Sequence, residues 1–108
     1  MAIVTFYNGD PKDAPKTTMP AHLGANAIIT CKNRLLLEKR SDSDVWGLVG
    51  GGCKKWETGR QAIVREVYEE LGLRIAPDRF RKLAVYDNPG RIAAFRDGSI
   101  WRMVIVVY

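Results

Sequence analysis

Acidic side chains gather at one place in this chain, where Glu66, Glu69 and Glu70 stand close together. In a helix these positions share one arc of the surface, because residues three and four apart are neighbours. Neighbouring like charges repel, and each pair costs about 0.2–0.5 kcal/mol in an isolated helix. Taken alone, the cluster indicates either a solvated acidic face or a divalent-cation site. Mg²⁺ or Mn²⁺ suits an all-carboxylate set whose shell is completed by water and substrate phosphates.

The residues around the cluster favour the cation site. The glycines 50–52 and an isolated Glu57 precede it, Arg65 adjoins it and Gly72 follows it. Over residues 51–73 the pattern is G-x5-E-x7-R-E-U-x-E-E-x-G-U, where U is a bulky aliphatic residue. A diphosphate and a carboxylate cluster repel each other. Metal ions that bridge them would polarise the phosphoryl oxygens and lower the pKa of bound water.

This segment resembles the Nudix box of the MutT/Nudix hydrolases and matches each of its fixed positions. Similar flanks extend the resemblance over about residues 21–108: the strand at 35–40 resembles the one that precedes the box, and 46–51 resembles the W-x-x-P-G-G approach. The resemblance implies a Mg²⁺- or Mn²⁺-dependent nucleotide pyrophosphohydrolase. Its substrate would be a nucleoside diphosphate linked to another moiety, with water attacking phosphorus. The alternative is a non-catalytic, Nudix-like domain that binds a nucleotide as a sensor.

The resemblance also assigns roles to individual residues. Oxygen ligands for the metal would come from Glu66, Glu69, Glu70 and the Gly50 carbonyl. Arg65 would hold Glu57 or a neighbouring glutamate in place, which makes Glu57, Arg65 and Glu66 the catalytic candidates. The attacking water could be oriented or deprotonated by Glu66 or by a carboxylate outside the box.

Substrate contacts are expected from Gly51, Gly52 and Arg91. The chain departs from the family pattern at Val49, where proline is usual, and at Trp56, where glycine is common. Trp56 could narrow the loop beside the metals or pack on the start of the helix, and both interpretations stay open.

Three other side chains are weighed outside the box. His22, the only histidine, is expected to have a structural or surface role, with substrate contact as the alternative. Trp46 is expected to seal the core below the glycines, with base stacking as the alternative. Cys53 is expected to be a small filler rather than a nucleophile.

The elements that position these residues follow the order β, β, β, helix, β, β, β. Strands are expected at 2–7, 22–31, 35–39, 80–86, 92–95 and 100–108, with a loop at the glycines 50–52. Thr58 and Gln61 form a capping box and Gly72 a left-handed cap, so the helix lies between them. Ile63, Val64, Val67 and Leu71 would face the sheet, and Ala62 would lie in the acidic arc. The fold class is therefore α+β, of the α/β/α sandwich type, with a mixed β-sheet.

The composition bounds the remaining possibilities. A chain of 108 residues is expected to form one domain, with residues 1–20 as an N-terminal strand and loop. The formal net charge of +5 is distributed along the sequence, which favours attraction of phosphorylated small molecules and predicts no specific nucleic-acid partner. No apolar run has the length of a membrane helix and no signal peptide is recognised, so a cytoplasmic location is expected.

The sequence stops within its most β-prone run, 103–108. Family members usually continue for several tens of residues, so we interpret the chain as truncated at its C-terminus, with strands and a helix missing. An uncovered apolar strand favours association. We therefore predict a homo-oligomer formed through this C-terminal region.

Overall fold

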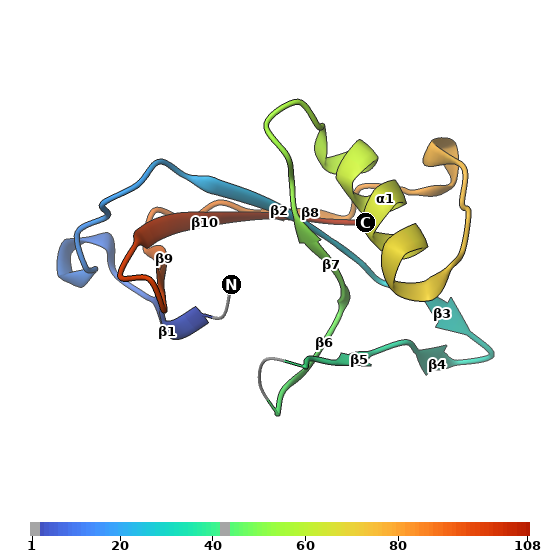
Figure 1. Ribbon diagram of the computed structural model, residues 1–108, viewed down its shortest axis with the longest axis horizontal. Helices are drawn as coiled ribbons and strands as arrows, with labels where there is room; N and C mark the ends of the chain where they lie inside the picture. Colours follow the sequence, from blue (N-terminus) through green and yellow to red (C-terminus); the bar gives the residue numbers. More distant parts are fainter. Residues whose placement is uncertain (1–2, 42–43) are drawn as a thin grey trace.

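The computed structural model describes residues 3–41 and 44–108. Its centre is a six-stranded mixed sheet with the strand order β1-β9-β10-β2-β7, in which β8 pairs with β10 beside β9 (Figure 1). The strands of this sheet are β1 (Ile3–Asn8), β2 (His22–Ala27), β7 (Val49–Gly52), β8 (Ala84–Tyr86), β9 (Arg91–Phe95) and β10 (Ile100–Val107). β10 and β2 run parallel and every other pair of this sheet is antiparallel.

Four shorter strands connect β2 to β7. They form two hairpins, β3 (Thr30–Cys31) with β4 (Arg34–Leu35) and β5 (Glu38–Lys39) with β6 (Trp46–Gly47). The expected strand 35–39 is thus split, because β4 pairs back to β3 while β5 pairs forward to β6. Two 3-10 turns, η1 (Pro11–Asp13) and η2 (Pro77–Arg79), complete the elements.

The helix α1 (Gly59–Leu71) begins and ends where its caps predict. The Thr58 hydroxyl accepts a hydrogen bond from the Gln61 backbone N–H at 3.1 Å, and the Gln61 side chain accepts from the Thr58 N–H at 2.9 Å. Gly72 adopts a left-handed conformation with φ 72°. α1 has 13 residues, which is too short to cross a bilayer. No other helix in the described part of the chain is long and apolar enough to do so.

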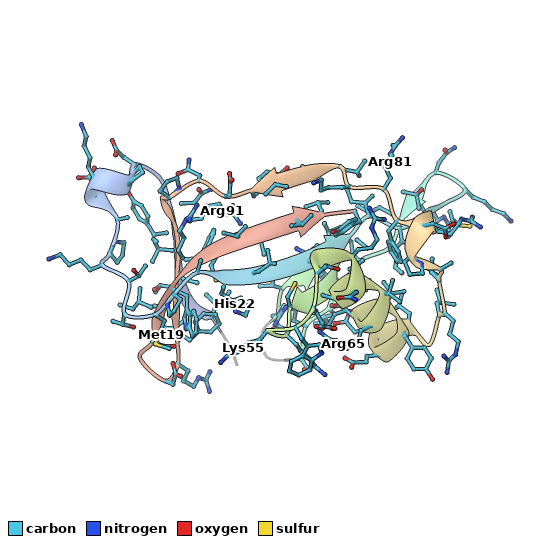
Figure 2. All side chains as sticks on the ribbon, turned by 90° about the horizontal axis from the view of Figure 1, so that it is seen from above. Met19, His22, Lys55, Arg65, Arg81 and Arg91 are labelled. Atoms are coloured by element: carbon cyan, nitrogen blue, oxygen red, sulfur yellow. The ribbon has the colours of Figure 1, made fainter. Side chains whose placement is uncertain are left out.

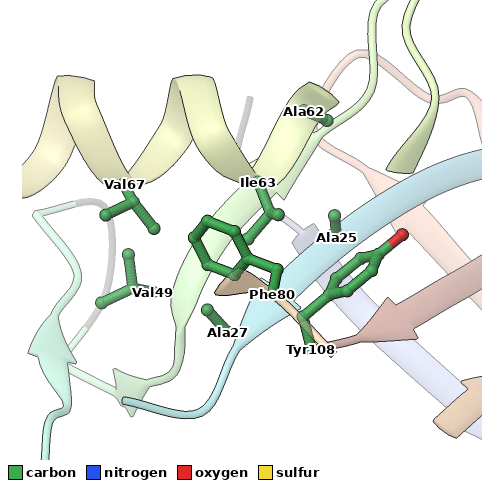
Figure 3. Close-up of a cluster of buried hydrophobic side chains, with 8 residues drawn as sticks. All are labelled: Ala25, Ala27, Val49, Ala62, Ile63, Val67, Phe80 and Tyr108. Atoms are coloured by element: carbon green, nitrogen blue, oxygen red, sulfur yellow. The ribbon is translucent and has the colours of Figure 1, made fainter. Parts of the chain in front are cut away.

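α1 covers one face of the sheet, and the core lies between them (Figures 1 and 3). Ile63 and Val67 point from the helix into this core, as predicted. Ala62, one helical turn before Glu66, is also fully buried there, so the sheet covers this end of the acidic arc. The core cluster consists of Ala25, Ala27, Val49, Ala62, Ile63, Val67, Phe80 and Tyr108. The fold class is α+β as expected, with one helical layer in the part that the structure describes.

Three further strand predictions need correction. The glycines 50–52 belong to the edge strand β7 and pair with residues 24–26 of β2, so they are not a loop. The predicted strand 80–86 begins only at Ala84, because Phe80 closes η2 and enters the core. The predicted strand 22–31 is interrupted between Ala27 and Thr30. In the strand predicted at 2–7, residue 2 lies outside the described residues.

β10 is an interior strand. Residues 103–107 pair with β2 on one side, while residues 100–102 pair with β9 and residues 105–107 with β8 on the other. Backbone pairing therefore covers much of this strand, which was expected to be uncovered, in the described part of the chain. Association through this region stays a prediction, and it would have to use side chains.

Candidate active site

Arg65 organises the carboxylates on the α1 side of the sheet (Figure 2). Its Nε and Nη2 donate to the two carboxylate oxygens of Glu57 at 2.7 and 2.9 Å, a bidentate pair. Its Nη1 donates to Glu66 at 2.9 Å and to Glu69 at 3.2 Å. Its Nη2 also donates to the Gly52 carbonyl on β7 at 3.0 Å. One guanidinium thus fixes three glutamates relative to the edge strand, and we call these groups the Arg65 clamp.

The hydrogen bonds of the clamp favour the ionised forms of Glu57 and Arg65. The hydrogen bond from Arg65 lowers the pKa of Glu57 to about 2, against an ordinary value of 4.5. The same bond raises the pKa of Arg65, so both groups stay ionised over the working range of pH. The Glu57 side chain is only 8% exposed, and its charge is compensated by the guanidinium and by the Lys54 backbone N–H at 2.8 Å.

Glu70 has different partners. The Gly50 backbone N–H donates to it at 3.2 Å, and the carboxyl group of Glu38 on β5 hydrogen-bonds to it. Burial, and then the contact with Glu38, raise the pKa of Glu70 to about 7. Two adjacent carboxyl groups do not readily ionise together, so they share a proton or need a cation.

Glu38, Glu66 and Glu70 line one open hollow of about 550 Å³ together with Gly50 and Gly51. Glu69 does not line it: half of its side chain is exposed and its carboxylate bonds to Arg65. Within residues 3–41 and 44–108, no group of three or more Asp, Glu, His or Cys side chains is placed so that it could hold a metal ion. Lys39, Arg40 and Ser41 complete the lining, so the carboxylates of this open hollow stand beside two basic side chains.

Glycines bring the helix carboxylates onto β7. A Cβ atom on Gly51 would lie 2.6 Å from Oε1 of Glu66, so any other residue would push that carboxylate away. Gly50 has φ +154°, and a Cβ atom there would overlap the Ala25 carbonyl and the Asn26 side chain. The family-like glycines therefore have a packing reason at these positions.

A second cavity, of about 490 Å³, lies on the sheet face opposite α1. Side chains from β1, β2, β9 and β10 form most of its wall, and the three glycines of β7 form its boundary toward the carboxylates. Arg40, Gly50 and Gly51 line both this cavity and the carboxylate hollow. The two spaces therefore meet around the edge strand.

The structure does not bring every candidate residue together. Arg91 lines neither space: its guanidinium lies between the rings of Phe6 and Tyr86, 5.2 and 5.6 Å from their centroids. Figure 2 places Arg91 and Arg65 on opposite sides of β10 and β2. No described contact therefore connects Arg91 with the carboxylates.

Two tryptophans are more exposed than expected. Trp46 is 60% exposed, so it does not seal the core. Trp56 is 78% exposed and lies beneath the Lys54 ammonium at 5.6 Å, which leaves it unpacked against the helix start. Burial and the nearby Glu57 charge raise the pKa of Cys53, which agrees with a filler rather than a nucleophile.

Sequence reasoning missed two groups that the fold brings to the site. Glu38 lies between the leucines 35–37 and the basic pair 39–40, and no spacing relates it to the box. The one feature of the sequence that could indicate Glu38 is a carboxylate directly after three leucines, in the segment that precedes the box. The pairing of His22 with Trp101 joins residues 79 positions apart, a contact that local pattern does not contain.

Comparison with known proteins agrees with this geometry. A family model described as NUDIX domain matches residues 20–107. A MutT-like protein of Streptomyces ambofaciens is 32% identical over 86 residues, covering 80% of this chain and 54% of that protein. An RNA pyrophosphohydrolase of Psychromonas ingrahamii is 42% identical over 59 residues, covering 53% and 32%.

Among solved structures, the fold resembles a MutT/nudix family protein from Enterococcus faecalis. The TM-score is 0.67 at 24% identity, with coverage of 89% of this chain and 38% of that chain. This chain spans about half, or less, of the length of the curated relatives described above.

Proposed function

Because the chain belongs to the Nudix family, we propose that it hydrolyses a nucleoside diphosphate linked to another moiety by attack of water on phosphorus. The observation that carries this function is the Arg65 clamp, which fixes Glu57, Glu66 and Glu69 against the glycine strand. An ordinary solvated acidic face would need no such shared guanidinium. The name of the Psychromonas ingrahamii relative, an RNA pyrophosphohydrolase, supports the same class of bond.

The residues present fit a hard divalent cation, Mg²⁺ or Mn²⁺. Glu38, Glu66 and Glu70 supply carboxylate oxygens to the hollow. The contact between Glu38 and Glu70 brings two carboxyl groups together that a cation would allow to ionise. Glu66 and Glu70 would hold the metal, with Glu38 and the Gly50 carbonyl as further donors. Glu69 bonds Arg65 outside the hollow, so it would support the clamp rather than bind the metal directly. When bound, the metal would neutralise phosphoryl charge and lower the pKa of a bound water.

The protein side chains then have distinct tasks. Arg65 bonds Oε1 of Glu66, which leaves Oε2 to accept a proton from the attacking water or to orient it. Glu57 keeps Arg65 in its orientation. Glu38 is the carboxylate outside the box that could take the base role instead. The organic part of the substrate would extend around β7 into the 490 Å³ cavity.

A substrate panel tests the hydrolase. The protein is incubated with Mg²⁺ and nucleoside triphosphates, oxidised nucleotides, ADP-ribose, nucleotide sugars or dinucleoside polyphosphates, and phosphate-bearing products are measured. We expect turnover of at least one member, loss of turnover in Glu66→Gln, and full turnover in Asp78→Asn, an exposed acid on η2. Nucleotide binding without turnover of any member would favour the sensor and contradict the hydrolase.

A further inference from the structure

The cavity opposite α1 has an aromatic wall built from three strands. His22 begins β2, and Phe95 ends β9 next to Trp101 on β10. The His22 ring meets Trp101 at 5.8 Å and Phe95 at 6.4 Å between centroids, both nearly perpendicular. All three residues line the same cavity, together with apolar side chains such as Met103 and Ile105. Flat rings around an apolar space are typical of a pocket for a planar aromatic group.

The wall is fixed before any ligand arrives. The Trp101 indole N–H donates to the Ser99 hydroxyl at 2.9 Å. That hydroxyl donates to Asp97 at 2.6 Å, and the Ser99 backbone N–H donates to the same oxygen at 2.9 Å. The turn is closed by two backbone bonds, from Phe95 N–H to the Ser99 carbonyl and from Gly98 N–H to the Phe95 carbonyl. Because these bonds already hold the Trp101 ring in place, less conformational entropy is lost when a ligand binds against it.

His22 is the polar ring of this wall, and Asn26 and Arg40 also line the cavity. Burial lowers its pKa, so at neutral pH the imidazole is uncharged and has one N–H donor and one acceptor nitrogen. Its ring contacts in the described part of the chain are with Trp101 and Phe95, and no hydrogen bond to either nitrogen is formed there. A neutral donor and acceptor pair complements the edge of a heterocycle, whereas an aliphatic tail would leave both nitrogens without partners.

His22 also lies directly across β7 from the Arg65 clamp. A Cβ atom on Gly52 would come within 2.9 Å of the imidazole, so glycine makes room for it. The carbonyl of the same Gly52 accepts a hydrogen bond from Arg65 on the other side. The single strand β7 thus separates the aromatic wall from the carboxylates. One substrate could contact both by passing around the edge of β7.

We propose, resting on the hydrolase function above, that His22 determines substrate specificity by hydrogen-bonding the polar edge of a nucleobase that packs against Trp101. Ser99 and Asp97 are positioning residues that set the indole orientation. The ligand class is a nucleoside diphosphate derivative with an intact aromatic base, in preference to a diphosphate of a sugar or a lipid.

A binding experiment tests the site separately from turnover. Trp46→Phe and Trp56→Phe replace the two exposed tryptophans and leave Trp101 as the sole indole among the three in the chain. This variant is titrated with an α,β-methylene nucleoside diphosphate and, as the base-free probe, with methylenediphosphonate, both with Mg²⁺. We expect the nucleotide to quench Trp101 fluorescence and to bind about tenfold or more tightly than the base-free probe.

His22→Phe in the same background keeps a ring but removes both nitrogens. We expect about tenfold weaker nucleotide binding, a reduced preference among the four bases, and unchanged affinity for methylenediphosphonate. Ser99→Ala should raise KM with little change in kcat and alter the near-ultraviolet signal of Trp101, and Ser99→Thr should restore both.

The outcomes separate the two proposals. Equal affinity for both probes, or the same base preference in His22→Phe, would overturn the nucleobase site even if phosphate release persists. Quenching that depends on His22 without turnover of any substrate would overturn the hydrolase and keep the nucleobase site.

Discussion

On the α1 face of the sheet, charged side chains are held by one another, whereas on the opposite face aromatic rings are held by a turn. The Arg65 clamp joins Glu57, Glu66 and Glu69 through side-chain hydrogen bonds of 2.7–3.2 Å. The ring wall depends on Asp97 and Ser99, which lie outside the cavity. Disturbing the first face should therefore change charge and catalysis together, while disturbing the second should change which substrate binds.

β7 makes this division possible. Gly51 contacts the helix side, Gly52 contacts His22, and Gly50 bonds Glu70. Side chains on β7 would occupy the space that Glu66 takes on one face and His22 on the other. Three glycines leave only the backbone between a carboxylate hollow and a nucleobase-sized cavity.

The largest effect is expected from Glu66→Gln. The amide keeps the hydrogen-bonding shape but loses the charge that would hold a metal, so kcat should fall about a hundredfold or more. Steady-state phosphate release measures this, with thermal unfolding as the check on folding. Binding of the methylene nucleotide to Trp101 should change much less than kcat. An equal loss of both would mean that the two faces do not act separately.

Arg65→Ala should give the next largest effect, and on stability as well as rate. Removing the guanidinium leaves the Glu57 charge nearly buried without its partner, so the free energy of unfolding should fall by about 3 kcal/mol. Chemical denaturation measures this. Lys39→Met is the matched control, because the pair of Lys39 with Asp44 is exposed at 55% and 97% and should contribute about 0–1 kcal/mol. A similar loss in both variants would contradict the special role of the clamp.

The pH dependence of metal binding should follow Glu70. Its pKa in the folded protein is raised from 4.5 to about 7, so without metal the stability contributed by its protonated form is complete below pH 4.5. That contribution is lost as the pH rises through about 7. Mg²⁺ replaces the proton, so the increase in Tm caused by Mg²⁺ should be larger at pH 8 than at pH 5.5.

Glu38→Gln is the matched variant for that measurement. It removes the neighbouring carboxyl charge that raises the pKa of Glu70, so the pH dependence of the Mg²⁺ effect should move to lower pH. The same Mg²⁺ effect at pH 5.5 and pH 8 in the unmodified chain would contradict this assignment.

Local chemistry was readable from the sequence, and long-range contacts were not. The caps of α1 and the burial of Ile63 and Val67 follow from spacing within one helix. The glycines 50–52 look like a loop because glycine has low strand propensity. In the fold they form a strand, and glycine is needed there because Glu66 and His22 come so close to the backbone. The full burial of Ala62 does not follow from the helical wheel, because a wheel does not show how far the sheet extends over the acidic arc.

Strand pairing sets the remaining features. Glu38 reaches Glu70 because β5 pairs forward to β6 rather than continuing β4. His22 reaches Trp101 because β2 pairs in parallel with β10, and Met103 lies opposite His22. Both depend on register between distant segments, which a single sequence does not specify. The sequence pattern places Arg91 in a turn, which favours a substrate contact. In the fold Arg91 begins β9, and its guanidinium lies over the rings of Phe6 and Tyr86.

The smallest effect should come from Thr58→Ala, which tests whether the helix end affects only its own face. The variant removes the hydrogen bond to the Gln61 N–H, and the free energy of unfolding should fall by about 1 kcal/mol. Thr58→Ser keeps that acceptor and should retain nearly all of the stability.

Because the cap lies next to Glu57, a shift of the clamp would appear as a lower kcat. Trp101 fluorescence should not change, since its fixed contacts come from the β9–β10 turn. A change in the Trp101 signal would show that the glycine strand transmits strain between the faces, and the two regions would then have to be treated as one site.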